Sequence, residues 1–284
     1  MSISRVLQVQ VGSMVLLVAT AAFGQPLNSA QQKCVNTVNK GMASISKAEW
    51  SSVAKCIKSY AKDPTVDVEI CLSLASKPLI ATAKAVEKAG AACSVAAPEF
   101  GLFDELSPAF ALGGGEFLAA SLLGDLLSAG TAPCDDPVFG DAPCKCQNAI
   151  LAAAGKNLGL YVSLFNKCKK AGLKDQSIVD LTTLGSCMAE PGKLDPKGKL
   201  AKAAEKLAAT VGKKCTDEAV SDPFPTGLCG SPSDGAAFTS CVQAQVRCTA
   251  CFYAVYVDEA VVDCDIFDDG ALNDSCVADC PVCP

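Results

Sequence analysis

Two Cys-x-x-Cys pairs are the residues of this chain whose type and spacing could do chemistry, Cys248 with Cys251 and Cys280 with Cys283. A redox-active pair needs a thiol whose pKa is lowered by a cation or by a helix N-terminus. The first pair has only Arg247 beside it, and the second lies in an acidic tail, where negative charge raises a thiol pKa. Structural disulfides are therefore the favoured interpretation. A thiol-disulfide oxidoreductase and a four-thiolate zinc site are the alternatives.

A cluster of carboxylates near the C-terminal end could bind a hard cation. Oxygen ligands at this density suit calcium. The segment does not follow the EF-hand pattern, because Asp268 stands where a glycine is needed and Asp274 where a glutamate is needed. We expect either a weak calcium site in the loop between Cys264 and Cys276 or a solvated acidic turn. The candidate ligands are Asp263, Asp265, Asp268 and Asp269.

None of the 284 residues is a histidine, which excludes most other catalytic mechanisms. There can be no Ser-His-Asp or Cys-His catalytic pair and no histidine-bound zinc. A hydrolase that acts through paired carboxylates remains an alternative, but no aspartate is marked by an apolar pocket in the sequence. We therefore expect a non-enzymatic protein without a resident cofactor, apart from the calcium hypothesis.

The N-terminal segment predicts export. Residues 1–24 carry Arg5, then an apolar run, then the small-residue exit Ala22-Phe23-Gly24 of a secretory signal peptide. All 18 cysteines follow it, an even number that predicts up to nine disulfides in a periplasmic, cell-surface or extracellular protein. The other long apolar stretch, residues 110–129, contains Glu116 and Asp125, so we expect a buried helix there and no membrane span in the mature chain.

Two segments 112 residues apart resemble one another. Lys33 to Asp63 aligns without gaps on Lys145 to Asp175 with nine identities in 31 positions, and both cysteines of each segment match. Each copy continues to a third cysteine and to a lysine- and alanine-rich helix that ends in a fourth. Two copies of one unit are the simplest explanation.

The cysteine spacing predicts that each unit contains an antiparallel helical hairpin. In the first copy both arms span 22 residues, about 33 Å if helical. Equal arms bring the two inner cysteines together at the turn and the two outer ones at the open end. The second copy can pair in the same nested way, with extra chain around Pro191 to Pro196. The predicted disulfides are Cys34–Cys93, Cys56–Cys71, Cys146–Cys215 and Cys168–Cys187.

Helical periodicity predicts which faces of these arms are buried. Leu79, Ala83, Val86, Gly90 and Cys93 follow one stripe of the first returning arm, and a similar stripe runs from Leu200 to Cys215 in the second. The capping box Ser46-Lys-Ala-Glu49 predicts a break in the first long arm. A further apolar segment follows each hairpin, residues 110–129 and 236–262.

Charge alternates along the chain in the same way in both copies. Residues 28–93 and 145–215 are net basic, while residues 94–144 and 216–284 carry one arginine against twenty carboxylates. The simplest interpretation of these charged segments is that they form solvent-exposed faces. A sharper hypothesis is attraction between basic hairpins and acidic segments, within a chain or by self-association. Nucleic acid is a poor partner candidate, because the net charge is −6, only two arginines occur and no aromatic residues alternate with the lysines. Anionic glycans or lipid head groups stay open. Two exposed lysine stripes are expected at the hairpin turns, formed by Lys55, Lys58 and Lys62 and by Lys167, Lys170 and Lys174.

The run from Cys34 to Cys93, repeated from Cys146 to Cys215, resembles an uncharacterised family of exported, cysteine-rich, helical tandem-repeat proteins from environmental bacteria of deltaproteobacterial type. The acidic segment from Asp263 to Cys276 resembles the close of the repeat in that family. The resemblance implies an all-helical fold and export, and it transfers no functional residue. The first copy departs from the pattern because it lacks the acidic cysteine loop.

The sequence thus predicts an all-α protein of two tandem, disulfide-linked helical-hairpin units, each followed by an apolar helix, with an irregular cysteine-rich tail. The expected boundaries are a signal peptide at 1–24, unit 1 at 25–133, unit 2 at 134–262 and the acidic tail at 263–284. Ligand and partner are unknown at this stage.

Overall fold

The described part of the chain folds into eight helices and contains no strand. In this computed structural model they are α1 (Ser29–Tyr60), α3 (Ser76–Cys93), α5 (Asp141–Asp175), α6 (Leu181–Ala189), α7 (Pro191–Leu194), α8 (Lys199–Lys214), α9 (Gly235–Asp258) and α10 (Cys264–Asp269). The all-α prediction is confirmed. The structure describes residues 26–60, 62–63, 65–66, 70–71, 74–94, 126, 141–215, 229–230, 233–273 and 275–276.

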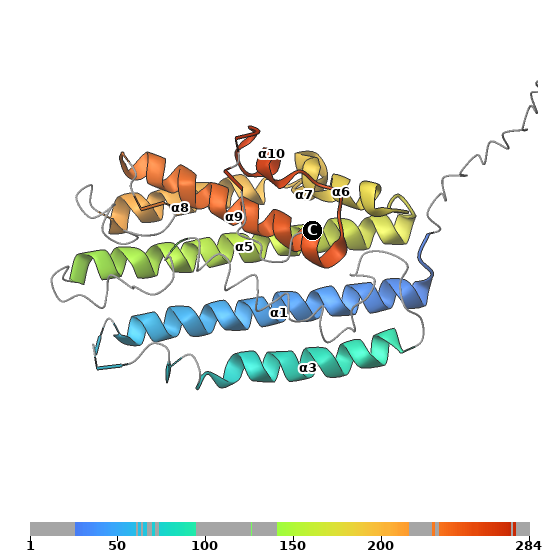
Figure 1. Cartoon of the computed structure of the whole chain (residues 1–284), viewed down its shortest axis with the longest axis horizontal. Coiled ribbons are helices and arrows are strands. Elements are labelled where there is room, and N and C mark those ends of the chain that lie inside the picture. The colour runs from blue at the N-terminus through green and yellow to red at the C-terminus, as the bar shows by residue number, and fades with distance from the viewer. Residues whose placement is uncertain are drawn as a thin grey trace, which may run out of the picture.

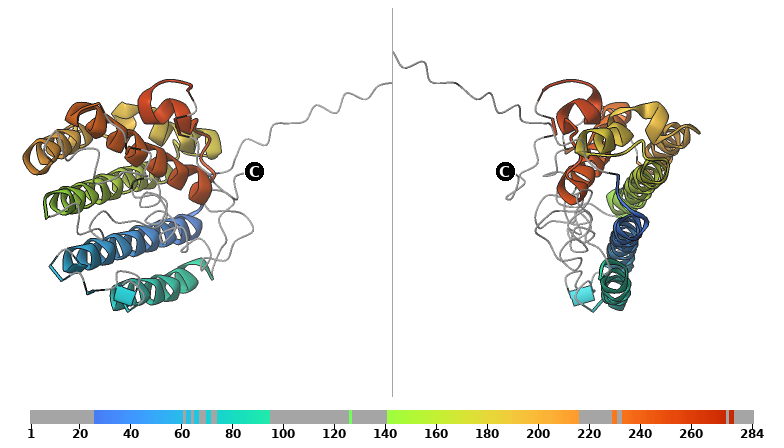
Figure 2. Two further views of the ribbon diagram at one scale, coloured as in Figure 1. Left: turned by 60° about the vertical axis from the view of Figure 1, so that its left-hand side comes forward. Right: turned by 90° about the vertical axis from the view of Figure 1, so that its right-hand side faces the viewer.

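The long helices lie side by side in the order α3, α1, α5, with α8 and α9 beyond α5 (Figure 1). The end-on view of Figure 2 shows α3, α1 and α5 in a row. Helices α1 and α5 run in opposite directions and are in contact, so α5 joins the two hairpins. One hydrophobic core therefore runs through α1, α5 and α9.

Disulfides close both ends of each hairpin. Hairpin 1 consists of α1 and α3, and hairpin 2 consists of α5 and α8 with α6 and α7 in the connection between them. Seven disulfides join described residues, and four of them bond the cysteines that the nested pairing predicts: Cys34–Cys93, Cys56–Cys71, Cys146–Cys215 and Cys168–Cys187. A chain with this many cross-links belongs in an oxidising compartment.

Helix α1 is continuous, so the break predicted from its capping box is wrong. Trp50, the residue that directly follows this box, is buried against α5. Its Nε1 donates to the carbonyl oxygen of Leu151 at 2.8 Å. The indole occupies the space above Gly155, where a Cβ would overlap its ring. This contact between hairpins outweighs the local signal for a helix start.

The face that α3 buries differs from the predicted stripe. Leu79 is 68% exposed and Val86 is 39% exposed, whereas the buried residues of α3 are Pro78, Ala85, Ala89 and Ala92. The small alanine side chains allow α3 to approach α1 closely, and the larger residues face outward. In α8 the predicted stripe is buried at Leu207 and Val211, because α8 packs against both α5 and α9.

The segment predicted as a third helix of unit 2 forms α9, which begins after the N-cap Asp234. Its three cysteines form disulfides with neighbouring segments: Cys241 bonds Cys229, Cys248 bonds Cys276 and Cys251 bonds Cys264. Helix α6 packs beneath the segment after α9, where a Cβ on Gly185 would overlap the carbonyl of Val261.

Several predictions fall outside the described residues. They are the signal peptide at 1–24, most of the apolar segment 110–129 and the Cys280/Cys283 pair. Within 110–129 only Leu126 is described, and it is helical and fully buried. None of the described helices is long and apolar enough to cross a membrane.

Candidate functional site

A groove between the two arms of hairpin 2 is the most developed candidate site. It has a volume of about 880 Å³, within the range of ligand pockets. Its floor is formed by small or aliphatic side chains of α5 and α8, because alanines at facing positions leave space between the helices. The floor residues include Ala149, Ala152, Ala153, Leu160, Ala203 and Leu207.

Lysines border this groove along its whole length. Lys156 comes from α5, and the other five come from α8: Lys199, Lys202, Lys206, Lys213 and Lys214. All six are exposed, and no aspartate or glutamate is among the described residues that line the groove. We call this feature the lysine groove. An apolar floor between positive edges suits a ligand that is both anionic and partly apolar.

Disulfides hold the lysine groove in shape. Cys146–Cys215 joins α5 to the end of α8 beside Lys214, and Cys168–Cys187 ties the connection back to α5. Asp195 also fixes the start of α8, because its Oδ2 accepts from the backbone N–H of Leu200 at 2.6 Å. A groove fixed by covalent bonds loses little conformational entropy when it binds.

The lysine stripes predicted at the hairpin turns are exposed and lie outside the lysine groove. They fit the simplest interpretation, a solvent-exposed face. The composition of α8 marks it as basic, but it does not show that its lysines lie beside the alanine face of α5.

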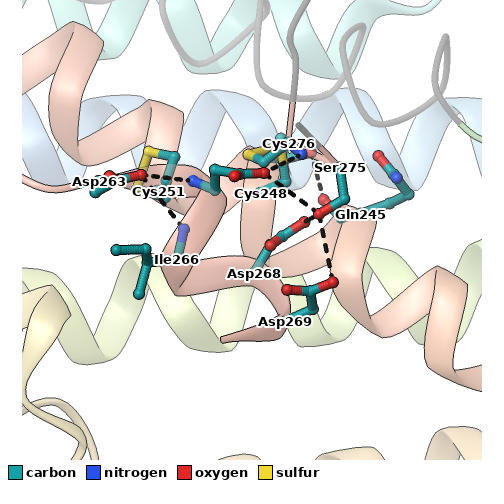
Figure 3. The surroundings of a disulfide bond; sticks show 12 residues. Gln245, Cys248, Cys251, Asp263, Ile266, Asp268, Asp269, Ser275 and Cys276 are labelled. Carbon is teal, nitrogen blue, oxygen red and sulfur yellow. Dashed lines mark hydrogen bonds between the residues drawn. A yellow bond between two sulfur atoms is a disulfide. The ribbon is translucent and has the colours of Figure 1, made fainter. Parts of the chain in front are cut away.

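The first Cys-x-x-Cys pair is not a dithiol couple. Cys248 bonds Cys276 and Cys251 bonds Cys264, so each cysteine tethers a different part of the tail to α9 (Figure 3). Cys248 and Cys251 are both buried. The oxidoreductase alternative is therefore wrong for this pair, and the pair Cys280/Cys283 lies outside the described residues.

The acidic tail uses its carboxylates to organise its own backbone. Asp263 caps α10 by accepting from the N–H groups of residues 265 and 266. Asp265 accepts from the N–H of Asn273 at 2.7 Å, and Asp269 accepts from the Asn273 side chain at 2.9 Å. These bonds hold the pKa of Asp269 below its ordinary value, with the Asn273 amide as the main cause.

Asp268 is the one predicted ligand in this tail that is fully buried. Its Oδ2 accepts from the Ser275 hydroxyl at 2.9 Å, and burial raises the pKa of its carboxyl group (Figure 3). Among the residues that the structure describes, no three acidic or thiol side chains are grouped so as to hold a metal ion. The geometry therefore gives the calcium prediction for Asp263, Asp265, Asp268 and Asp269 no support, because these carboxylates serve mainly as acceptors for nearby N–H and O–H groups.

A buried pair that sequence reasoning missed lies between α5 and α9. Lys169 is 1% exposed and Asp258 is fully buried, and the Lys169 Nζ lies 2.6 Å from an Asp258 carboxylate oxygen. Burial lowers the pKa of Lys169 and raises that of Asp258 to about 6, while each partner's charge opposes the shift. One signal existed in the sequence: Lys169 aligns with Ile57, a buried residue of α1.

No protein-family model, curated protein or solved structure matches this chain. The resemblance to exported tandem-repeat proteins therefore stays a prediction from the sequence. Function has to be argued from the molecule's own geometry.

Proposed function

We propose that this chain is an exported, non-enzymatic binding protein whose lysine groove docks an acidic, amphipathic polypeptide segment of a partner. The disulfides support the exported, cross-linked part of the proposal. The observation that carries the binding part is the lysine groove itself, whose described lining has six lysines and no carboxylate around an apolar floor.

The distribution of charge favours a polypeptide over a lipid. A single anionic head group would need positive charge at one end of an apolar slot, whereas Lys199 and Lys214 stand near opposite ends of α8. Residues 149 to 160 of α5 extend for about 16 Å, which is three turns of helix. An amphipathic helix with small apolar residues on one face and carboxylates beside them would match this groove along its length.

A direct binding measurement tests the proposal. The probe is a synthetic helical peptide of glutamate, alanine and leucine, with a lysine-for-glutamate version as its charge control. We expect the oxidised full-length protein to bind the acidic peptide with an affinity that falls as salt rises, and to ignore the basic one.

Two triple variants with the same change in charge locate the site. Lys199→Glu/Lys202→Glu/Lys206→Glu should reduce binding of the acidic peptide by about tenfold or more, because three favourable contacts become repulsive. Lys77→Glu/Lys84→Glu/Lys88→Glu on the exposed surface of α3 should leave binding close to wild type. Equal losses in both variants, tighter binding of a fatty-acid anion, or binding only to a second copy of the chain would overturn the proposal.

A further inference from the structure

The contact between Lys169 and Asp258 is too short and too poorly aligned to be an ordinary buried salt bridge. Nζ and Oδ2 are 2.6 Å apart, yet the contact lacks the alignment of a hydrogen bond, and neither atom bonds any other described residue. The second oxygen of Asp258 likewise has no hydrogen-bond partner among the described residues. A buried ammonium or carboxylate normally satisfies its remaining donors or acceptors, since an unsatisfied buried charge is strongly unfavourable.

The surroundings of the pair are apolar and aromatic. The Lys169 Nζ lies 5.6 Å from the centre of the Phe165 ring. Tyr253 is 1% exposed and packs edge-on against Phe165, with ring centres 6.2 Å apart. Asp258 is the last residue of α9, where the partial negative charge of the helix end disfavours an additional carboxylate. Burial and the helix end favour the neutral amine and the neutral carboxylic acid, while the Phe165 ring attracts an ammonium group and opposes this effect.

The directions of the pKa shifts agree with this environment. Burial lowers the pKa of Lys169 and raises that of Asp258 to about 6. A proton that passes from the ammonium to the carboxylate leaves a nucleophilic amine beside a protonated carboxyl group. Reacting groups held in contact have most of the entropic barrier to reaction already removed.

We propose that Lys169 and Asp258 are joined by an intramolecular amide bond between the Lys169 Nζ and the Asp258 Cγ. The neutral amine attacks the carboxyl carbon, the new N–C bond forms, and the C–O bond to the hydroxyl breaks. The hydroxyl leaves with one proton from the nitrogen as a single water molecule. No oxidant, reductant or other reactant is consumed.

The bond would supply a connection that the disulfides do not make. Among the described residues, the disulfides of α5 reach Cys187 and Cys215, and those of α9 reach Cys229, Cys264 and Cys276. None of these ties α5 to α9. An amide at Lys169 and Asp258 links the two helices directly, and it survives reduction.

Mass spectrometry of the wild-type protein tests the proposal. After full reduction and alkylation of its cysteines, the intact chain should be lighter than its sequence by one water molecule. A tryptic digest should contain a branched peptide that joins the segments around residues 169 and 258, uncut after Lys169. Recovery of both segments only as separate linear peptides, with cleavage after Lys169, would overturn it.

Two variants make the assignment specific. Lys169→Ile copies the residue at the aligned position of α1, and Asp258→Ala removes the electrophile, so each should restore the full sequence mass and abolish the branched peptide. Fragmentation of the wild-type branched peptide provides a readout that does not depend on variant folding. It should place the link on the Lys169 side chain, and a link at any other lysine contradicts the proposal.

Discussion

Hairpin 1 and hairpin 2 share their cysteine spacing and their cross-links, yet their returning arms bury different residues. In α3 the larger apolar residues Leu79 and Val86 face outward, whereas α8 buries Leu207 and Val211. Helix α8 has α9 as a second neighbour, while α3 packs mainly against α1. The amphipathic pattern marks which residues can be buried, and the available neighbours decide which of them are.

At two aligned buried positions, one hairpin has a polar residue where the other has an apolar one. Hairpin 1 buries Asn39, whose amide bonds no described residue, where hairpin 2 has the aligned residue Leu151. Hairpin 2 buries Lys169 where hairpin 1 has Ile57. Because Ile57 shows that an apolar residue can occupy this position, packing alone does not explain the lysine.

The largest effect on either hairpin should come from removing its outer disulfide. Cys34→Ala/Cys93→Ala and Cys146→Ala/Cys215→Ala should each lower the free energy of unfolding by about 2–5 kcal/mol in urea denaturation. The bridges span 59 and 69 residues, so their chain-entropy terms are nearly equal.

Hydrogen exchange separates the two variants further. Without Cys34–Cys93, α3 should exchange much faster than the rest of the chain, because its buried face consists mainly of alanines. Without Cys146–Cys215, α8 should keep more of its protection through its contacts with α9. Equal loss of protection in α3 and α8 would contradict the structural difference between the hairpins.

A smaller effect is expected at the contact that joins the hairpins. Gly155→Ala places a methyl group where the Trp50 indole lies, and should lower the free energy of unfolding by about 1–3 kcal/mol. The fluorescence of Trp50, the only tryptophan, should shift to the red as the ring moves toward solvent.

Gly159→Ala is the matched control on the same helix. A methyl group at this position would meet no neighbouring atom within 4 Å, so the substitution should raise the free energy of unfolding by about 0.5–1 kcal/mol. A Gly155→Ala protein as stable as Gly159→Ala would show that the hairpins are not locked together through Trp50.

The smallest effect concerns a turn that both hairpins share. Asp63 and the aligned Asp175 accept hydrogen bonds from Thr65 and Ser177, and the side chains of these two residues are the main reason that both aspartate pKa values lie below the ordinary 3.8. Because the folded-state pKa is lowered, each carboxylate contributes stability above its ordinary pKa. That contribution is lost as pH falls through the lowered value.

Titration of the carboxyl carbons by NMR measures both pKa values in one experiment. Thr65→Val and Ser177→Ala should each return only the neighbouring aspartate toward 3.8 and leave the other unchanged. Ordinary titration of Asp63 and Asp175 in the wild type would rule out these turns in solution.

Part of the candidate site could be predicted from the sequence. The basic character of α8 is visible in its composition, and the alanines of α5 are visible in its helical pattern. Their meeting in the lysine groove depends on the rotation of each helix about its own axis. The cysteine positions do not determine that rotation, because a disulfide fixes two points and leaves the intervening side chains to packing. The pairing of Lys169 with Asp258 could not be predicted either, because Asp258 lies 89 residues further along the chain.

Local patterns in the sequence are sufficient to predict the helical class and the nested cysteine pairs, because helical periodicity is local and equal arms leave few ways to pair four cysteines. Packing between distant segments sets three further features: α1 is unbroken, α3 buries its alanines, and Lys169 contacts Asp258. Each of these outcomes depends on a neighbour distant in the chain, such as Gly155 for Trp50 or α9 for α8. Packing energies of that kind outweigh a local capping or amphipathic signal worth about 1 kcal/mol.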